Sequence, residues 1–279
     1  MEHSSWLRIK RFIAGYSSGV ALVVAGHPFD TIKVRMQTQG SQGKFNGVVD
    51  CVRSTIQHEG VGGLYKGMLT PLLMTGFVNS ALFGMQFNIV AEIVRHRTND
   101  PAAKPTVAET MQAAVVSGGI ISILVTPMEG IKGRLQVQYK PLYNGPVDCF
   151  KKVYATLGLR NGIYRGWTAV ALCRMSNYSY FGSYALISSW FSDKQTDKPL
   201  PFSAAIMAGG LSGCCYWLSC YPLDVIKNRI QAAPDTKVPL YRNIVSAAKT
   251  IYKTEGLKGF TVGFTPCVLR DFLLMQVLS

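Results

Sequence analysis

The chain has 279 residues, of which 48% are hydrophobic and only 16% are charged, and its formal net charge is +14. A soluble domain usually carries about 25% charged residues, so the composition favours a membrane protein over the alternative of a soluble helical repeat protein. The lysines and arginines lie at the ends of the apolar segments and in the loops between them. They do not form one stripe with stacking aromatics, which argues against a nucleic-acid partner.

Six apolar segments follow one another and are predicted to be transmembrane helices: 11–36, 69–94, 108–136, 167–191, 202–230 and 264–279. Most are long enough for the ~20 apolar residues that a helix needs to cross a bilayer. The sixth has 16 residues, which at a rise of 1.5 Å per residue reach roughly 24 Å, less than a ~30 Å hydrocarbon core. We therefore expect a short sixth helix and a less stable bundle at that end.

A Pro-x-acidic-x-x-Lys signature occurs three times, each time in the last third of an odd-numbered segment, beginning at Pro28, Pro127 and Pro222. The period is about one third of the chain, which corresponds to a pair of membrane helices rather than to a solenoid repeat. The predicted fold is therefore an all-α membrane protein with six transmembrane helices in three pseudo-threefold repeats around a central cavity. The expected repeats, which form one integrated domain, are 1–100, 101–198 and 199–279.

The signature residues are predicted to form a ring inside the bundle. A proline within a helix removes a backbone hydrogen bond and kinks the helix, so the three prolines should bend the helices together at one end. The acid and the lysine of each copy are three residues apart and share a helix face, so each acid can reach the lysine of the next helix. The predicted ion pairs are Asp30–Lys132, Glu129–Lys227 and Asp224–Lys33.

Ionisable residues inside a membrane are costly and usually mark a pathway. We interpret the three pairs as a gate that breaks and reforms, and the alternative is a static ring that only holds the helices together. A glutamine follows each proline by nine positions, where an amide could brace the pairs. These glutamines are Gln37, Gln136 and Gln231.

Aromatic-basic-glycine motifs precede the second and fourth segments, as Tyr65-Lys66-Gly67 and Tyr164-Arg165-Gly166. Backbone amides at a helix start, together with a cation and an interfacial aromatic, can hold a lipid phosphate. A membrane lipid such as cardiolipin is the expected partner, and plain interfacial anchoring fits the motif equally well. The third copy, Thr261-Val262-Gly263, lacks the aromatic and the cation, so a third lipid site should be weaker.

The remaining chemistry-bearing residues predict neither a metal nor an enzyme. Seven cysteines lack the paired spacing of metal ligands and are interpreted as small packing residues. Four scattered histidines come with no nucleophile–base pair and no Gly-rich phosphate loop, so no cofactor is expected either. The N-terminus has no cleavable signal-peptide pattern.

Over essentially its whole length the sequence resembles the mitochondrial carrier family of inner-membrane solute transporters. The resemblance implies a monomeric, multi-pass protein of the mitochondrial inner membrane with six tilted helices. It also implies a cavity gated alternately by a matrix network, which is the three pairs above, and by a cytoplasmic network on the even-numbered helices. The regions of the second network read Phe87-Asn88-Ile89-Val90-Ala91 and Tyr184-Ala185-Leu186-Ile187-Ser188. They contain neither acid nor base, so this second gate is expected to be weak or absent.

Within the family, the stretch from Gly26 to Gln39 is similar to the carnitine/acylcarnitine and basic amino-acid branch. The substrate contacts that this resemblance implies are Met74, Cys173, Arg174, Arg270 and Asp271. Arg174 and Arg270 could clamp a substrate carboxylate, and the alternative is that they are snorkelling cations. The branch usually places an acid after the fourth-helix arginine, and Met175 departs from that pattern.

The expected function is alternating-access exchange of a small carboxylate-bearing metabolite, such as an amino acid or a carnitine-type compound, without covalent chemistry. The alternative is a truncated, non-transporting or leaky product of the same family, because the sixth segment is short.

Overall fold

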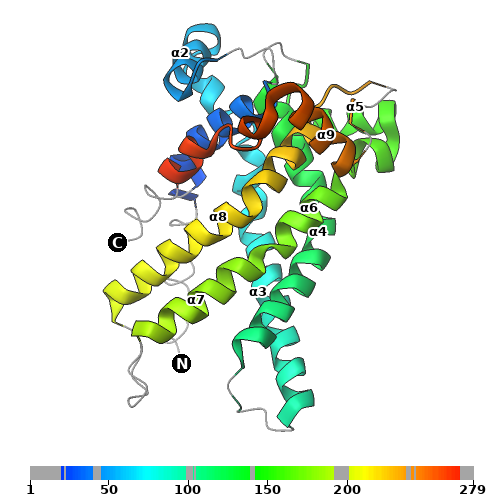
Figure 1. Ribbon diagram of the computed structural model, residues 1–279. Helices are drawn as coiled ribbons and strands as arrows, with labels where there is room; N and C mark the ends of the chain where they lie inside the picture. The colour runs from blue at the N-terminus through cyan, green and yellow to red at the C-terminus, as the bar shows by residue number, and fades with distance from the viewer. Residues whose placement is uncertain are drawn as a thin grey trace, which may run out of the picture.

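The computed structural model describes residues 20–21, 23–39, 45–98, 103, 105–138, 142–191, 201–236, 240–241 and 243–270. These residues form helices joined by turns and short loops, and there is no β-strand among them (Figure 1). The predicted all-α class is therefore confirmed.

The long helices coincide with the predicted segments: α3 (Leu69–Thr98), α4 (Val107–Val137), α6 (Trp167–Met175), α7 (Asn177–Phe191) and α8 (Phe202–Ala232). The first segment is helical over 23–38 and the last over 264–270, beyond which the residues lie outside the described part. The fourth segment is divided at Ser176 into α6 and α7. Two helical stretches, Gly76–Thr98 and Val107–Val137, are long and apolar enough to cross a membrane.

Three short helices gather at one end of the bundle: α2 (Val48–Glu59), α5 (Pro146–Gly158) and α9 (Ile244–Glu255) (Figure 1). Each is followed by a tight helical turn: η2 (Val61–Tyr65), η3 (Leu159–Ile163) and η4 (Gly256–Phe260). The C-terminal halves of α4 and α8, which carry their signatures, run toward this end. We call it the signature end, and away from it α7 still packs against the start of α4, since a Cβ on Gly182 would lie 2.9 Å from Met111 Sδ.

The signature prolines lie inside helices rather than at helix ends. Pro127 is within α4 and Pro222 is within α8, and Pro28 lies in the helical run over 23–38. The start of α4 is fixed by a capping box. The Thr106 hydroxyl accepts a bond from the Glu109 amide, and the Glu109 carboxylate accepts one from the Thr106 amide.

The distribution of polar and apolar side chains is that of a membrane bundle. Polar and charged side chains are buried between the helices, whereas large apolar side chains are exposed on the outer faces of the long helices. Exposed examples are Leu73, Phe77, Phe87, Ile120, Leu124, Leu186, Trp190 and Leu218. Soluble monomers rarely expose so much contiguous apolar surface, so these faces suit a lipid environment.

Gly118 permits a close approach between the backbones of α4 and α6. A methyl group added to it would lie 2.4 Å from the Arg174 carbonyl oxygen and 2.7 Å from the Arg174 carbonyl carbon. Backbone atoms cannot move aside as a flexible side chain can, so any residue larger than glycine would push the two helices apart. At the neighbouring Gly119 the closest atom would be Met175 Cγ at 3.9 Å, which is ordinary contact.

This difference makes a matched test of the packing. Gly118→Ala is expected to destabilise the protein by about 1–3 kcal/mol, because overpacking outweighs the helical preference of alanine. Gly119→Ala should be neutral or stabilising by up to ~1 kcal/mol, since alanine favours the helix and meets no obstacle. Thermal unfolding in detergent measures both. Equal melting temperatures for the two variants would show that α4 and α6 are not packed as closely as described.

Candidate functional site

A cavity of about 550 Å³ lies between the helices and receives side chains from all three signatures. Its lining includes the six charged signature residues, which we call the signature ring: Asp30, Lys33, Glu129, Lys132, Asp224 and Lys227. It also includes four of the five residues suggested as substrate contacts: Met74, Cys173, Arg174 and Arg270. The fifth, Asp271, lies outside the described residues.

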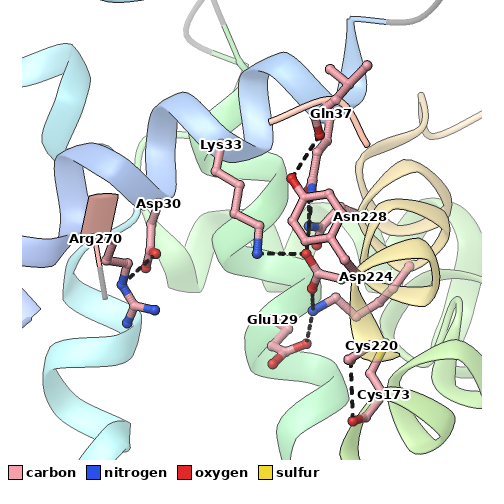
Figure 2. A network of polar contacts seen from close by, with 12 residues as sticks. Asp30, Lys33, Gln37, Glu129, Cys173, Cys220, Asp224, Asn228 and Arg270 are labelled. Carbon is pink, nitrogen blue, oxygen red and sulfur yellow. Dashed lines mark hydrogen bonds and ion pairs between the residues drawn. The ribbon is translucent and has the colours of Figure 1, made fainter. Parts of the chain in front are cut away.

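The structure brings together the residues of all three expected pairs. Lys132 Nζ lies 2.7 Å from Asp30, Lys33 Nζ lies 2.7 Å from Asp224, and Lys227 Nζ lies 3.1 Å from Glu129. Each pair joins two signature helices that are about 100 residues or more apart in the sequence. Figure 2 shows Lys33 and Asp224 reaching toward each other across the ring. Lys33 also lies over the Trp217 ring, with Nζ 4.1 Å from its centroid, which adds a cation–π contact.

The ring is not three isolated pairs, because each acid holds two cations. Lys227 also contacts Asp224 of its own helix at 2.9 Å, so it bridges two acids. Arg174 binds Glu129, and Arg270 Nε lies 3.0 Å from Asp30 (Figure 2). The two arginines suggested as substrate clamps are therefore joined to the ring acids in this conformation.

The neutral contact residues line the same cavity. Met74 is partly exposed to it, whereas Cys173 is buried at the contact between α6 and α8. There the Cys220 thiol points at the Cys173 carbonyl oxygen, with a sulfur–oxygen distance of 3.7 Å (Figure 2).

The three glutamines differ from one another, contrary to a common bracing role. Gln37 donates to Asp224 at 3.3 Å and accepts a bond from Asn228, so it does touch an ion pair. Gln136 instead donates to the Thr31 hydroxyl at 3.2 Å. The Gln231 side chain is 2% exposed, and its Nε2 has no hydrogen-bond partner among the described residues.

The residue three positions after each signature proline explains this difference. Gln136 of the second repeat faces Thr31 of the first, which offers a hydroxyl. Gln231 of the third repeat faces Gly130 of the second, where a Cβ would lie 3.9 Å from its Nε2, and glycine offers no side chain. The corresponding residue for Gln37 is the apolar Val225, and Gln37 binds Asp224 instead.

The arginine two positions after each signature lysine has a structural role that sequence reasoning missed. Arg35 forms a two-bonded pair with Glu59, at 2.8 and 2.9 Å, and its Nε donates to the Gln136 carbonyl at 2.9 Å. Arg229 pairs with Glu255 in the same way, and its Nε donates to the Gln37 carbonyl at 2.7 Å. Each arginine thus joins its own short helix to the neighbouring signature helix. The repeated Glu-Gly step in the sequence was the available signal.

The second repeat lacks this acid, and a residue from the third repeat replaces it. Leu157 precedes the positive-φ Gly158, as Glu59 and Glu255 precede Gly60 and Gly256, so leucine occupies the acidic position. Arg134 pairs instead with Asp235, which follows α8, with nitrogen–oxygen distances of 3.1–3.2 Å.

Asp235 collects further partners from the second repeat. Arg165 Nη1 lies 3.3 Å from it, and the Tyr143 hydroxyl donates to it at 2.6 Å. Burial, and then the bond to Asp235, raise the pKa of Tyr143 well above its usual range, so this hydroxyl keeps its proton. Asp235 therefore ties three residues of the second repeat to the third.

The cations suggested for lipid binding contact protein acids instead. Lys66 binds Glu59 and donates to the Gln138 carbonyl at 3.1 Å, and Arg165 binds Asp235. Burial favours the neutral form of Glu59, but bonds from Arg35 and Lys66 outweigh it and hold the pKa of that carboxyl below its ordinary value. A lipid phosphate at these motifs would therefore compete with Glu59 and Asp235 for the two cations, although Arg165 Nε and Nη2 have no hydrogen-bond partner among the described residues.

The two motif glycines are required by backbone geometry. Gly67 and Gly166 have φ of 78° and 77°, in the left-handed region that other residues seldom adopt. They also pack against the next signature helix, because a Cβ on Gly67 would lie 3.1 Å from the Lys132 carbonyl oxygen.

Comparison with known proteins agrees with this architecture. A family model described as "Mitochondrial carrier protein" matches three times, at residues 6–96, 103–195 and 198–277. The mitochondrial substrate carrier family protein L of Dictyostelium discoideum is 41% identical over 95% of this chain and 90% of its own length. The mitochondrial basic amino acids transporter of Bos taurus is 36% identical over 94% of this chain and 86% of its own. Solute carrier family 25 member 48 of Bos taurus is 33% identical over 95% of this chain and 90% of its own length. Three matches to one family model, in a chain whose three signatures surround one charged cavity, show that it belongs to the mitochondrial carrier family of membrane transporters.

Proposed function

We propose that the chain is a secondary transporter of the mitochondrial inner membrane that exchanges a small carboxylate-bearing metabolite, such as an amino acid or a carnitine-type compound, by alternating access. The observation that carries the proposal is that the signature ring and the arginines share one cavity of about 550 Å³. This volume lies within the range of small-molecule sites. We further propose that the three repeats are 1–100, 101–198 and 199–279 and work as one domain.

In this proposal the ring is the gate at the signature end. A carboxylate that enters the cavity competes with Glu129 for Arg174 and with Asp30 for Arg270. Charge-assisted bonds to the substrate replace those to the ring acids, so the acids keep only their lysines and the network is weakened. Binding energy is thereby coupled to opening, because the substrate interacts differently with the two conformations.

Arg270 offers a direct test. Arg270→Ala is expected to abolish saturable uptake into liposomes, because the substrate loses a charge-assisted bond of about 1.5–3 kcal/mol. Arg270→Lys should recover only part of the rate, since lysine cannot form the two-bonded fork.

Arg95→Ala serves as the control, since Arg95 is an exposed arginine at the end of α3, far from the ring in sequence. Counter-exchange that saturates in the wild type supports a transporter, and unsaturable flux would indicate a leaky protein instead. If Arg270→Ala transports at the wild-type rate, Arg270 is not part of the substrate site.

A further inference from the structure

The charges that line the cavity do not balance. Among the described lining residues, five are lysine or arginine and three are aspartate or glutamate, so the formal surplus is 5 − 3 = +2 with histidine neutral. The cations are Lys33, Lys132, Lys227, Arg174 and Arg270, and the acids are the three of the signature ring. Charge in a cavity between helices is screened less than in bulk water, so the surplus interacts strongly with any ion that enters.

All three acids are already occupied. Asp30 holds Lys132 and Arg270, Glu129 holds Lys227 and Arg174, and Asp224 holds Lys33 and Lys227. A substrate with a net charge of +1, such as lysine, would therefore find no carboxylate without two cations among the described lining residues. It would also raise the surplus positive charge from +2 to +3, whereas a dicarboxylate lowers this surplus even when it carries an α-ammonium group.

The two arginines are the groups best placed to receive the substrate. Their side chains are 30% and 31% exposed, compared with 9–21% for the three lysines. Each arginine binds an acid that also holds a lysine, so it can turn to a new carboxylate without leaving that acid unpaired. Arginine matches a carboxylate with two parallel bonds, and the number of such arginines equals the surplus charge.

We propose that the substrate is a small dicarboxylate, either an acidic amino acid or a dicarboxylic acid without an amine, with one carboxylate on Arg174 and the other on Arg270. The inference rests on the proposed function and narrows its substrate class. It sets this chain apart from the relatives that are named as basic amino acids transporters.

The test compares four compounds in proteoliposomes that contain the full chain: succinate, aspartate, lysine and carnitine. Internal succinate or aspartate should accelerate uptake of the same labelled compound at least ~10-fold more than internal lysine or carnitine does, which corresponds to one charge-assisted bond. Uptake of aspartate but not of succinate would identify an acidic amino acid as the substrate, and uptake of succinate but not of aspartate would identify a dicarboxylic acid without an amine.

An isosteric charge provides the matched variant. Asn79→Asp places one negative charge on the cavity wall and lowers the surplus from +2 to +1. It should reduce dicarboxylate uptake by ~10-fold, again the equivalent of about one charge-assisted bond. Asn161→Asp makes the same change at an exposed position of η3 that is not among the lining residues, and it should leave uptake unchanged.

Thermal unfolding in detergent separates the possible failures. Succinate or aspartate should raise the melting temperature above that of acetate at equal ionic strength, and Asn79→Asp should reduce the shift. Saturable exchange of lysine or carnitine without dicarboxylates would overturn this inference and leave the transporter in place. If a dicarboxylate raises the melting temperature but no compound is transported, the inferred dicarboxylate site is supported and the proposed transport function is not. If none of the four compounds changes the melting temperature or shows saturable uptake, both the dicarboxylate inference and the proposed transport function are wrong.

Discussion

Asp235→Asn is expected to destabilise the protein by about 3–5 kcal/mol, because it leaves buried arginine without its counter-charge. Arg134 and Arg165 have side chains only 5% and 7% exposed, and both contact this carboxylate. An amide oxygen accepts hydrogen bonds but carries no charge, so two guanidinium groups would remain close together with nothing to offset their repulsion. Thermal unfolding in detergent measures the loss.

A second substitution should repair much of this damage. Leu157→Glu restores the acid at the position that Glu59 and Glu255 occupy in the other two repeats, where each pairs with its arginine. The double variant Asp235→Asn with Leu157→Glu should therefore recover a large part of the lost stability, whereas Leu157→Gln in the same background should not. Failure of the double variant to improve on Asp235→Asn would mean that Leu157 does not occupy the position equivalent to the two acids.

The pairing of the signature ring could be predicted because it follows from local rules repeated three times. An acid and a lysine three residues apart share a helix face, and a threefold arrangement of such faces leaves each acid beside the next lysine. The same reasoning placed most helix boundaries within a few residues, since long apolar segments flanked by charged loops define them. The division of the fourth segment at Ser176 was missed, because its composition is apolar on both sides.

Other features of the site depend on distances between helices, which no sequence pattern contains. Arg174 and Arg270 were interpreted as substrate clamps from their positions along single helices, and their contacts with Glu129 and Asp30 arise only when the helices converge. The glutamines were treated as equivalent, yet their partners are set by Thr31, Gly130 and Val225 on the facing helices. The repeats share the order of their short helices and their positive-φ glycines, and they differ in the side chains around these elements.

The role of Asp235 shows the same limit in another form. The gap at Leu157 is visible in the sequence once the repeats are aligned, but the compensating acid belongs to a different repeat, about 80 residues farther along. Only the fold places the segment after α8 beside the second repeat (Figure 1). The absence of an acid at Leu157 thus predicts that another acid pairs with Arg134, but it does not indicate where in the sequence that acid lies.

Exchanging Asp30 and Lys132 is the strongest test of the ring as a gate. The single variants Asp30→Lys and Lys132→Asp should each abolish saturable exchange, because each places like charges where Nζ and the carboxylate oxygen are now 2.7 Å apart. Like charges at this distance in a poorly solvated site repel by several kcal/mol. The double variant restores an opposite-charge pair in mirror form and should transport more than either single variant.

The recovery is expected to be partial, for a reason that the structure supplies. Arg270 Nε lies 3.0 Å from Asp30, so the lysine introduced at position 30 of the double variant would face this arginine as well as the aspartate introduced at position 132. Adding Arg270→Gln to the double variant should therefore raise its thermal stability, although the triple variant loses a substrate contact and should not transport. Thermal unfolding thus reports on the repulsion between position 30 and Arg270, whereas uptake also reports on the substrate contact that Arg270 makes. Equal loss of both quantities in the single and double variants would mean that Asp30 and Lys132 do not act as a pair, and the ring would then be a static support rather than a gate.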